Sequence, residues 1–184
     1  MTDSPNPWKT LSFRTVYDNP WIRVEEHRVV NPAGGLGEYG KVCFKNRAVA
    51  VAALDADANI VLVGQHRYTL AEFSWELPMG GAPLGEDPLA AAERELREET
   101  GFTARRWRLL MKLHPSNSIT DEVGYAYVAE GLEHGERALE ETEGDLRTCI
   151  VPFAEAVQWV LDGRITDAIS AAAILRLAVE RRGA

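Results

Sequence analysis

The sequence predicts an α+β fold in which helices cover a mixed sheet, with a small β unit at the N-terminus. Three observations support this class. Apolar or alternating β runs fill residues 21–64, one helix with clear start and stop signals follows over 88–101, and two more helical stretches come after residue 153. The order of strands, helix, strands and two helices is typical of an α+β protein or a mixed-sheet sandwich, not of a doubly wound parallel sheet.

The N-terminal part is expected to contain a β-hairpin. Residues 1–20 are rich in Pro, Asn and Ser, which favours an extended lead-in. Alternation from Trp21 to Val30 predicts a strand, and the turn residues Asn31–Gly35 would fold it back onto Tyr39–Phe44. We therefore expect residues 1–45 to form an N-terminal β unit and residues 46–184 to form the main domain.

The main domain is predicted to begin with two apolar strands, Arg47–Leu54 and Ile60–Gly64, joined by a short turn. The first helix has Asp87 as its N-cap, Pro88 at its first position and a stop at Gly101. Further strands are expected at Phe73–Leu77, Trp107–Leu113 and Val123–Ala129, and further helices at about Phe153–Leu161 and Asp167–Arg182.

Composition excludes several classes of function. The 184 residues suit one domain with a small addition, and no apolar run approaches the roughly 20 residues that span a bilayer. The net charge of −8 argues against nucleic-acid or anionic-membrane partners. Cys43 and Cys149 lie in apolar, strand-like contexts, so we expect two reduced and buried thiols, and the absence of a signal-like N-terminus favours a cytoplasmic protein.

A cluster of glutamates on the first helix predicts a metal site. Glu95 and Glu99 are four residues apart and share one helical face, with Glu98 beside them. Such carboxylates repel one another unless a cation lies between them, and Mg²⁺ or Mn²⁺ prefers carboxylate, carbonyl and water oxygens. The alternative is a solvated charged helix with Glu–Arg pairs. The glycine before the helix, Gly80, and the glycine stop after it favour the metal site.

The spacing of this segment resembles the Nudix box, written G-x5-E-x7-R-E-U-x-E-E-x-G-U with U apolar. It matches at Gly80, Glu86, Arg94, Glu95, Leu96, Glu98, Glu99, Gly101 and Phe102. The resemblance implies an α/β/α sandwich that hydrolyses a nucleoside diphosphate linked to a further group. It also implies that Glu95, Glu99 and the Met79 carbonyl bind metal, and that Glu98 is a further ligand or a water-mediated contact. Glu86 and Arg94 would brace the loop and orient the ligands.

Residues outside the box resemble the ADP-ribose and nucleotide-sugar pyrophosphatases of this family. Gln65–Tyr68 and Glu76–Gly80 are similar to their Q-Y-R … E-L-P-A-G pattern, although His66 replaces the Tyr and Met79 the Ala. Arg67 and Glu76 then become candidates for substrate binding, because a guanidinium fork matches phosphate oxygens. The alternative for Arg67 is an ordinary arginine at a strand end.

Two loops are candidates for the remaining functions. Ser116–Glu122 resembles the substrate loop of the subgroup, with Ser116 as a contact, but the glycine expected after Pro115 is missing, which leaves the sugar open. A plain polar turn is the alternative. Further on, Glu141 and Glu143 resemble the loop glutamates that act as general base or further metal ligand, with Glu122 as the other candidate base. A solvated acidic loop is the alternative there.

Together the resemblance implies an Mg²⁺-dependent pyrophosphatase, with Mn²⁺ as an alternative cation, that converts ADP-ribose or a related nucleoside diphosphate sugar to a nucleoside monophosphate and a sugar phosphate. It also implies a homodimer formed through the N-terminal unit, in which Trp21 or Tyr39 would stack on a base. Two other functions remain open at this point. One is hydrolysis of dinucleoside polyphosphates or other nucleotides, and the other is a non-catalytic sensor of nucleotide sugars.

Overall fold

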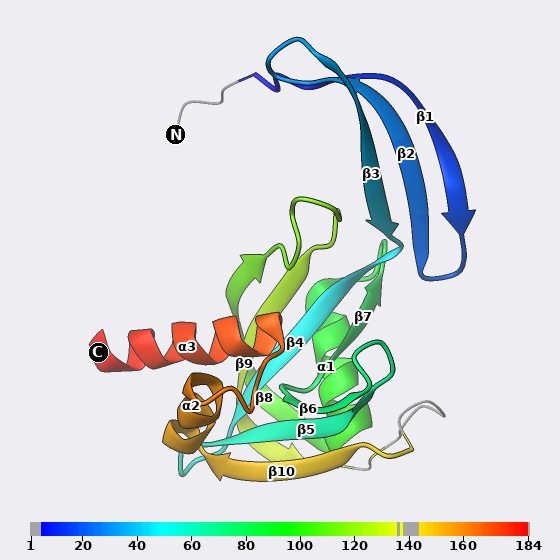
Figure 1. Cartoon of the computed structure of the whole chain (residues 1–184). Helices are drawn as coiled ribbons and strands as arrows, with labels where there is room; N and C mark the ends of the chain where they lie inside the picture. The colour runs from blue at the N-terminus through cyan, green and yellow to red at the C-terminus, as the bar shows by residue number, and fades with distance from the viewer. Residues whose placement is uncertain (1–4, 136, 138–143, 184) are drawn as a thin grey trace. The chain divides into compact units, whose positions relative to one another are not determined.

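The computed structural model describes residues 5–135, 137 and 144–183, and Figure 1 traces the elements in chain order. The chain forms two compact units. The smaller unit holds the N-terminal residues up to Asn46 together with Ser116–Glu122. The larger unit holds Arg47–Pro115 and the chain from Val123 onward, and it contains the glutamate-rich helix.

The smaller unit is a three-stranded antiparallel sheet in the order β1-β2-β3, made of β1 (Lys9–Asp18), β2 (Ile22–Val30) and β3 (Leu36–Phe44). The expected hairpin is present, but the prediction of an extended lead-in was wrong for residues 9–18. Within residues 1–20, Pro and Asn occur only at positions 5–7 and 19–20, on either side of β1, and β1 pairs with β2 from Lys9 to Asp18. An ion pair of 2.8 Å between Arg14 and Glu26 joins the two strands.

The larger unit is built on a seven-stranded sheet, along which five strands run in the order β10-β5-β4-β9-β8. Strands β4 and β9 are parallel, whereas β4–β5, β5–β10 and β8–β9 are antiparallel, so the sheet is mixed as predicted. Two short strands complete it, because β6 pairs with β5 and β7 pairs with β4. The strand bounds are β4 Asn46–Leu54, β5 Asn59–Arg67, β6 Glu72–Glu76, β7 Met79–Pro83, β8 Phe102–Leu113, β9 Gly124–His134 and β10 Arg147–Pro152.

Helices cover both faces of this sheet. Because side chains alternate along a strand, β4 sends Ala50, Ala52 and Leu54 to one core and Val49 and Val51 to the other. The first core also holds residues of α2 (Phe153–Leu161) and α3 (Ala168–Gly183), and the second holds residues of α1 (Pro88–Thr100). The result is the α/β/α sandwich that the box implies.

The ends of α1 follow the predicted signals in part. Asp87 occupies the N-cap position and Pro88 starts the helix, but the Asp87 side chain makes no capping hydrogen bond. At the other end Gly101 adopts φ +75° and donates its N–H to the Arg97 carbonyl at 2.9 Å. A left-handed residue of this kind ends helices and favours glycine. This stop places Glu98 and Glu99 in the last turn.

Two further predictions needed correction. The loop that the resemblance implied before the helix, braced by Glu86 and Arg94, is strand β7 from Met79 to Pro83, where the chain pairs with β4. Cys43 is buried as expected, but Cys149 is only half-buried because it lies on β10, an edge strand. Both thiols are free.

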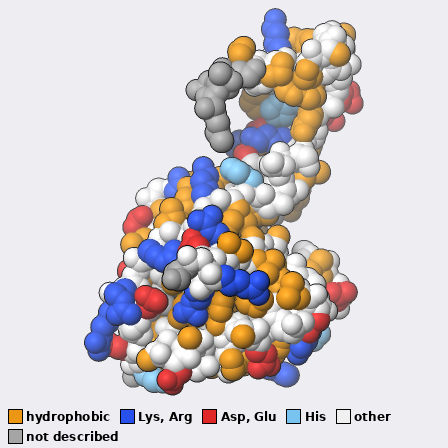
Figure 2. Space-filling view, turned by 90° about the vertical axis from the view of Figure 1, so that its left-hand side faces the viewer, with side chains coloured by type: hydrophobic (Ala, Val, Ile, Leu, Met, Phe, Trp, Pro, Cys, Tyr) orange, Lys and Arg blue, Asp and Glu red, His pale blue; other side chains and the backbone are white. Residues whose placement is uncertain are grey.

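The charges of the larger unit are unevenly distributed. Lys and Arg side chains gather around the C-terminal end of α3 (Figure 2), where Arg181 and Arg182 occupy the last turn. Cations there complement the partial negative charge of a helix C-terminus. Among the described residues, no helix has the length and apolarity needed to cross a membrane.

We predict that Gly64→Ala lowers the free energy of unfolding by about 1–3 kcal/mol. Gly64 lies in β5, and a Cβ there would come within 2.7 Å of ring atoms of Phe73 and of Trp75. These aromatic rings belong to the paired strand β6 and cannot turn away without repacking. Urea denaturation would measure the loss. Gly40→Ala is the control, because a Cβ at Gly40 meets no atom within 4 Å; equal stability of the two variants would contradict the prediction.

Candidate functional site

The two candidate metal-binding glutamates of α1 lie on its buried face. Glu95 is 7% exposed and Glu99 is fully buried. The Glu99 Oε2 atom accepts a hydrogen bond from the backbone N–H of Met79 at 2.9 Å, which ties the start of β7 to the last turn of the helix. Carboxylates are rarely buried unless a cation or hydrogen bonds compensate the loss of water. The pair therefore marks a place where a bound cation would offset the cost of burying two carboxylates.

Gly80 meets the carboxylate of Glu95 at very close range. A Cβ at this position would lie 2.2 Å from the Glu95 Cδ atom and 2.3–2.4 Å from its oxygens. Gly80 is not one of the glycines with positive φ, so the backbone itself does not require glycine. The glycine is needed because the carboxylate occupies the space of a side chain. This contact brings Glu95 alongside the Met79–Gly80 backbone.

Arg94 connects the carboxylates of the motif. Its Nη1 atom donates to Glu95 Oε1 at 2.8 Å and to Glu98 Oε2 at 3.1 Å, and its Nη2 atom donates to the Gly81 carbonyl at 2.9 Å and reaches Glu86 Oε2 at 3.5 Å. Burial opposes its charge, but the attraction of Glu95 and hydrogen bonds to Glu98, Glu95 and Glu86 outweigh burial and raise the Arg94 pKa. The guanidinium thus fixes the rotamers of the acidic side chains.

We expect Arg94→Lys to lower kcat by about 10- to 100-fold, which is the usual cost of removing a group that orients metal ligands. Lysine keeps the charge but cannot span Glu95, Glu98 and the Gly81 carbonyl with one planar fork. Steady-state kinetics at saturating Mg²⁺ would measure the loss. Arg105→Lys is the matched control, because Arg105 on β8 is 72% exposed and pairs with Glu133. Equal kcat values for the two variants would contradict the role assigned to Arg94.

Arg67 and Glu76, the two substrate candidates before the box, pair with each other. They lie on the paired strands β5 and β6, and the Arg67 Nε atom donates to Glu76 Oε1 at 2.9 Å while Nη2 contacts Oε2. The hydrogen bond to Glu76 raises the pKa of Arg67. Burial acts against this rise, whereas the negative charges of Glu76, Asp167 and Glu99 add to it. Arg67 is thus held as a cation within electrostatic range of the buried carboxylate of Glu99.

Sequence reasoning missed two residues that position this segment. The fully buried Ser170 accepts the Leu77 N–H on its Oγ atom at 2.9 Å, which anchors the chain between β6 and β7 to α3. Asp167 caps α3 by accepting the Ser170 N–H at 2.7 Å. A serine within the apolar run of α3, three residues after an aspartate, was the available signal.

The geometry provides oxygen donors but not a preassembled cluster of three side chains. Within the described ranges, no group of three or more His, Cys, Asp and Glu side chains is arranged to hold a metal ion. The described donors are the carboxylates of Glu95, Glu98 and Glu99 and the backbone beside Gly80. These are hard oxygen ligands with excess negative charge, which suits a divalent cation such as Mg²⁺. At Gly80 the Glu95 carboxylate fills the space that a side chain would occupy.

Two family models match the chain. A model described as the NUDIX domain matches residues 44–171, and one described as the nucleoside diphosphate sugar hydrolase N-terminal domain matches residues 8–42. The first match covers more than half of the chain and includes the whole box. The chain belongs to the Nudix family.

Relatives of this Nudix chain act on different nucleotide compounds. It is 35% identical to an ADP-ribose pyrophosphatase of Mycobacterium tuberculosis. The aligned 170 residues cover 91% of this chain and 82% of that protein. It is 30% identical to a CMP-5'-(N-acetyl-N-hydroxy-3-aminopropyl)phosphonate hydrolase of Streptomyces rubellomurinus, with 91% and 81% covered. The crystal structure of an ADP compounds hydrolase has the same fold, with a TM-score of 0.86 and 22% sequence identity. The match covers 99% of this chain and 98% of that chain.

The remaining candidates of the Nudix chain belong to the smaller unit or lie outside the described residues. Trp21, which is 66% exposed, belongs to the smaller unit, as do Ser116 and Glu122. The Ser116–Glu122 segment is fixed within that unit, because Val42 and Thr120 form a β-bridge and Asp121 pairs with Lys41 at 2.7 Å. Glu141 and Glu143, the loop glutamates, lie outside the described residues.

Proposed function

We propose that the chain is a divalent-metal-dependent pyrophosphatase that hydrolyses ADP-ribose or a related nucleoside diphosphate sugar to a nucleoside monophosphate and a sugar phosphate. The observation that carries the proposal is the pair of buried glutamates, Glu95 and Glu99, held one helical turn apart against the Met79–Gly80 backbone. The pyrophosphatase named among its relatives supports ADP-ribose as the first substrate to test.

The metal would be held by Glu95, Glu99 and the Met79 carbonyl, with Glu98 as a further or water-mediated ligand. When bound, Mg²⁺ or Mn²⁺ supplies positive charge for the diphosphate and lowers the pKa of water. Arg94 holds Glu95 and Glu98 in place, and Glu86 holds Arg94 from the other side. Mg²⁺ is the cation we propose first, because all of these donors are oxygen atoms.

The chain's own residues would orient the substrate and move one proton. In the reaction a water oxygen bonds to one phosphorus, the bridging P–O bond breaks, and the water's proton passes to a carboxylate. Glu141, Glu143 and Glu122 are the candidate bases, with Glu98 as a further candidate. Arg67, fixed by Glu76, would neutralise charge on the diphosphate, and Ser116 and Trp21 would contact the sugar or base.

The decisive experiment is a substrate panel with identified products. ADP-ribose, GDP-mannose, ADP-glucose and UDP-glucose are each incubated with Mg²⁺, with Mn²⁺ and with EDTA. We expect at least one substrate to yield a nucleoside monophosphate and a sugar phosphate, with no turnover in EDTA. Release of a nucleoside diphosphate and free sugar, or turnover that EDTA does not stop, would overturn the proposal. Tight binding without turnover would favour a sensor instead.

The proposal includes a homodimer formed through the smaller unit and, in keeping with the two free thiols, a cytoplasmic location. The sheet of this unit exposes large apolar side chains, which commonly mark a protein interface (Figure 2). They include Leu11, Phe13 and Val16 of β1 and Leu36 of β3. Light scattering on the wild type and on Phe13→Glu would test this point, and a monomeric wild type at micromolar concentration would refute it.

A further inference from the structure

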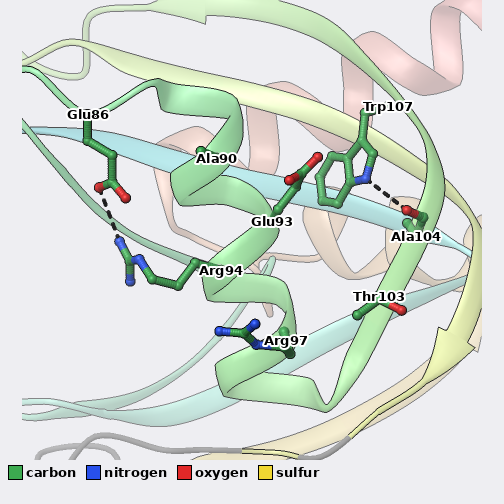
Figure 3. Close-up of a pocket in the computed structure, with 8 residues that line it drawn as sticks. All are labelled: Glu86, Ala90, Glu93, Arg94, Arg97, Thr103, Ala104 and Trp107. Atoms are coloured by element: carbon green, nitrogen blue, oxygen red, sulfur yellow. Dashed lines mark hydrogen bonds and ion pairs between the residues drawn. The ribbon is translucent and has the colours of Figure 1, made fainter.

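A cavity lies on the face of α1 that is opposite Glu95 and Glu99. It occupies about 420 Å³ between α1 and the edge strand β8 (Figure 3), which is within the usual range of roughly 300–1,000 Å³ for small-molecule sites. Its walls include Glu93, Arg94 and Arg97 of the helix and Trp107 of the strand. Glu95, Glu98 and Glu99 are not among its lining residues. The cavity therefore opens on the other face of the helix and adjoins the carboxylate site through Arg94 and Glu86, which line it as well.

One end of the cavity combines an aromatic ring with a carboxylate. The Trp107 Nε1–H donates to the Ala104 carbonyl at 3.1 Å, so this polar atom is already satisfied and the half-buried ring offers its apolar surface. In Figure 3 the Glu93 carboxylate points toward the indole. Within the described ranges the Glu93 side chain takes part in no hydrogen bond or ion pair. A flat ring that carries N–H donors fits these two groups, because its face stacks on Trp107 and its edge donates to Glu93.

The other end of the cavity is basic. The Arg94 and Arg97 guanidinium groups point away from Trp107 in Figure 3, toward Glu86. Arg94 is fully engaged with the carboxylates of the box, whereas Arg97 has one long contact, 3.7 Å to Glu98, and a side chain that is 54% exposed. An Arg fork of this kind binds phosphate oxygens in two-pronged fashion. Arg97 is thus the group that would meet an anion.

We propose that this cavity is a second nucleotide site, which takes a nucleoside monophosphate with its base on Trp107 and Glu93 and its phosphate on Arg97. A simple cation would be repelled by the positive charges of Arg97 and Arg94. A simple anion would make no contact with Glu93 or the indole ring. A nucleotide satisfies all of these groups at once. The choice of a monophosphate rests on the proposed function, because that reaction releases one.

Calorimetric titration of the whole chain in EDTA tests the site without turnover. CMP and UMP form a pair of probes of the same size, in which cytosine has a C4 amino group and an N3 acceptor where uracil has a C4 carbonyl and an N3–H donor. Because a carboxylate accepts from the cytosine amino group, we expect CMP to bind more tightly than UMP, and Glu93→Gln to reduce that difference. Ribose 5-phosphate and cytidine, which lack the base and the phosphate respectively, are each expected to bind at least about tenfold more weakly than CMP.

Variants separate this site from the catalytic one. We expect Trp107→Leu and Arg97→Gln each to raise the Kd for CMP at least about tenfold, whereas Arg105→Gln, an exposed arginine on the same strand, and Glu99→Gln leave it unchanged. No heat of binding, or a Kd that Trp107→Leu and Arg97→Gln do not alter, would overturn the proposal. Because binding is measured in EDTA, a failed titration leaves the substrate panel unaffected, and a failed panel leaves the titration result unaffected.

Discussion

Glu99→Gln is expected to lower kcat by about 10²–10³-fold and to abolish the stabilisation that Mg²⁺ gives the wild type. Glu99 is fully buried at the C-terminal end of α1, where its Oε2 atom accepts the Met79 N–H at 2.9 Å. Glutamine has nearly the same shape and can still accept this bond through its amide oxygen. The substitution therefore removes the charge while it preserves the packing of the helix against β7.

Two measurements distinguish this result from simple unfolding. Circular dichroism in EDTA should give the same spectrum for Glu99→Gln as for the wild type. The melting temperature should rise on addition of Mg²⁺ for the wild type but not for the variant. Glu155→Gln is the control, because Glu155 is an exposed glutamate in the first turn of α2. If Glu99→Gln keeps full turnover at saturating Mg²⁺, the metal assignment is wrong.

Local signals were sufficient for several elements of the larger unit. The alternation in β4 and β5 and the Asp87-Pro88 and Gly101 signals of α1 act within a few residues, so the sequence reveals them directly. In β7 the signal is weaker, because Gly and Pro are poor strand formers and the strand is defined by pairing with β4. Strand β1 pairs with β2, the next strand in the sequence, but the Pro and Asn residues on either side of β1 indicated irregular structure. This explains why β1 was taken for a lead-in and β7 for a loop.

The contacts within the candidate site depend on tertiary packing. The spacing of Glu95 and Glu99 follows from helical periodicity, but the pairing of Arg67 with Glu76 requires the register of β5 and β6. The anchoring of Leu77 by Ser170 joins residues that are 93 positions apart. A hydrogen bond between residues so far apart cannot be predicted from local patterns in a single sequence. The cavity beside α1 likewise forms only where β8 passes the helix, so the box alone does not indicate that Trp107 lines it.

Gly80→Ala is expected to reduce kcat by about 10²-fold or more while it leaves the free energy of unfolding within about 1 kcal/mol of the wild type. The new Cβ would occupy the position of the Glu95 carboxylate, 2.2 Å from its Cδ atom. The obstacle is the end of a flexible side chain, so Glu95 can rotate away at small cost. Rotation moves a candidate metal ligand out of place and disturbs its 2.8 Å bond to Arg94.

Gly64→Ala and Gly80→Ala should therefore fail in opposite ways. A Cβ at Gly64 meets rigid aromatic rings at 2.7 Å, so that variant loses stability while its folded fraction keeps kcat. A Cβ at Gly80 meets a movable carboxylate, so that variant stays folded and loses turnover and Mg²⁺ affinity. Gly183→Ala serves as the neutral reference, since no atom lies within 4 Å of its added Cβ. If Gly80→Ala were instead destabilised and fully active per folded molecule, the glycine would serve packing alone, and the close approach of Glu95 would have no part in catalysis.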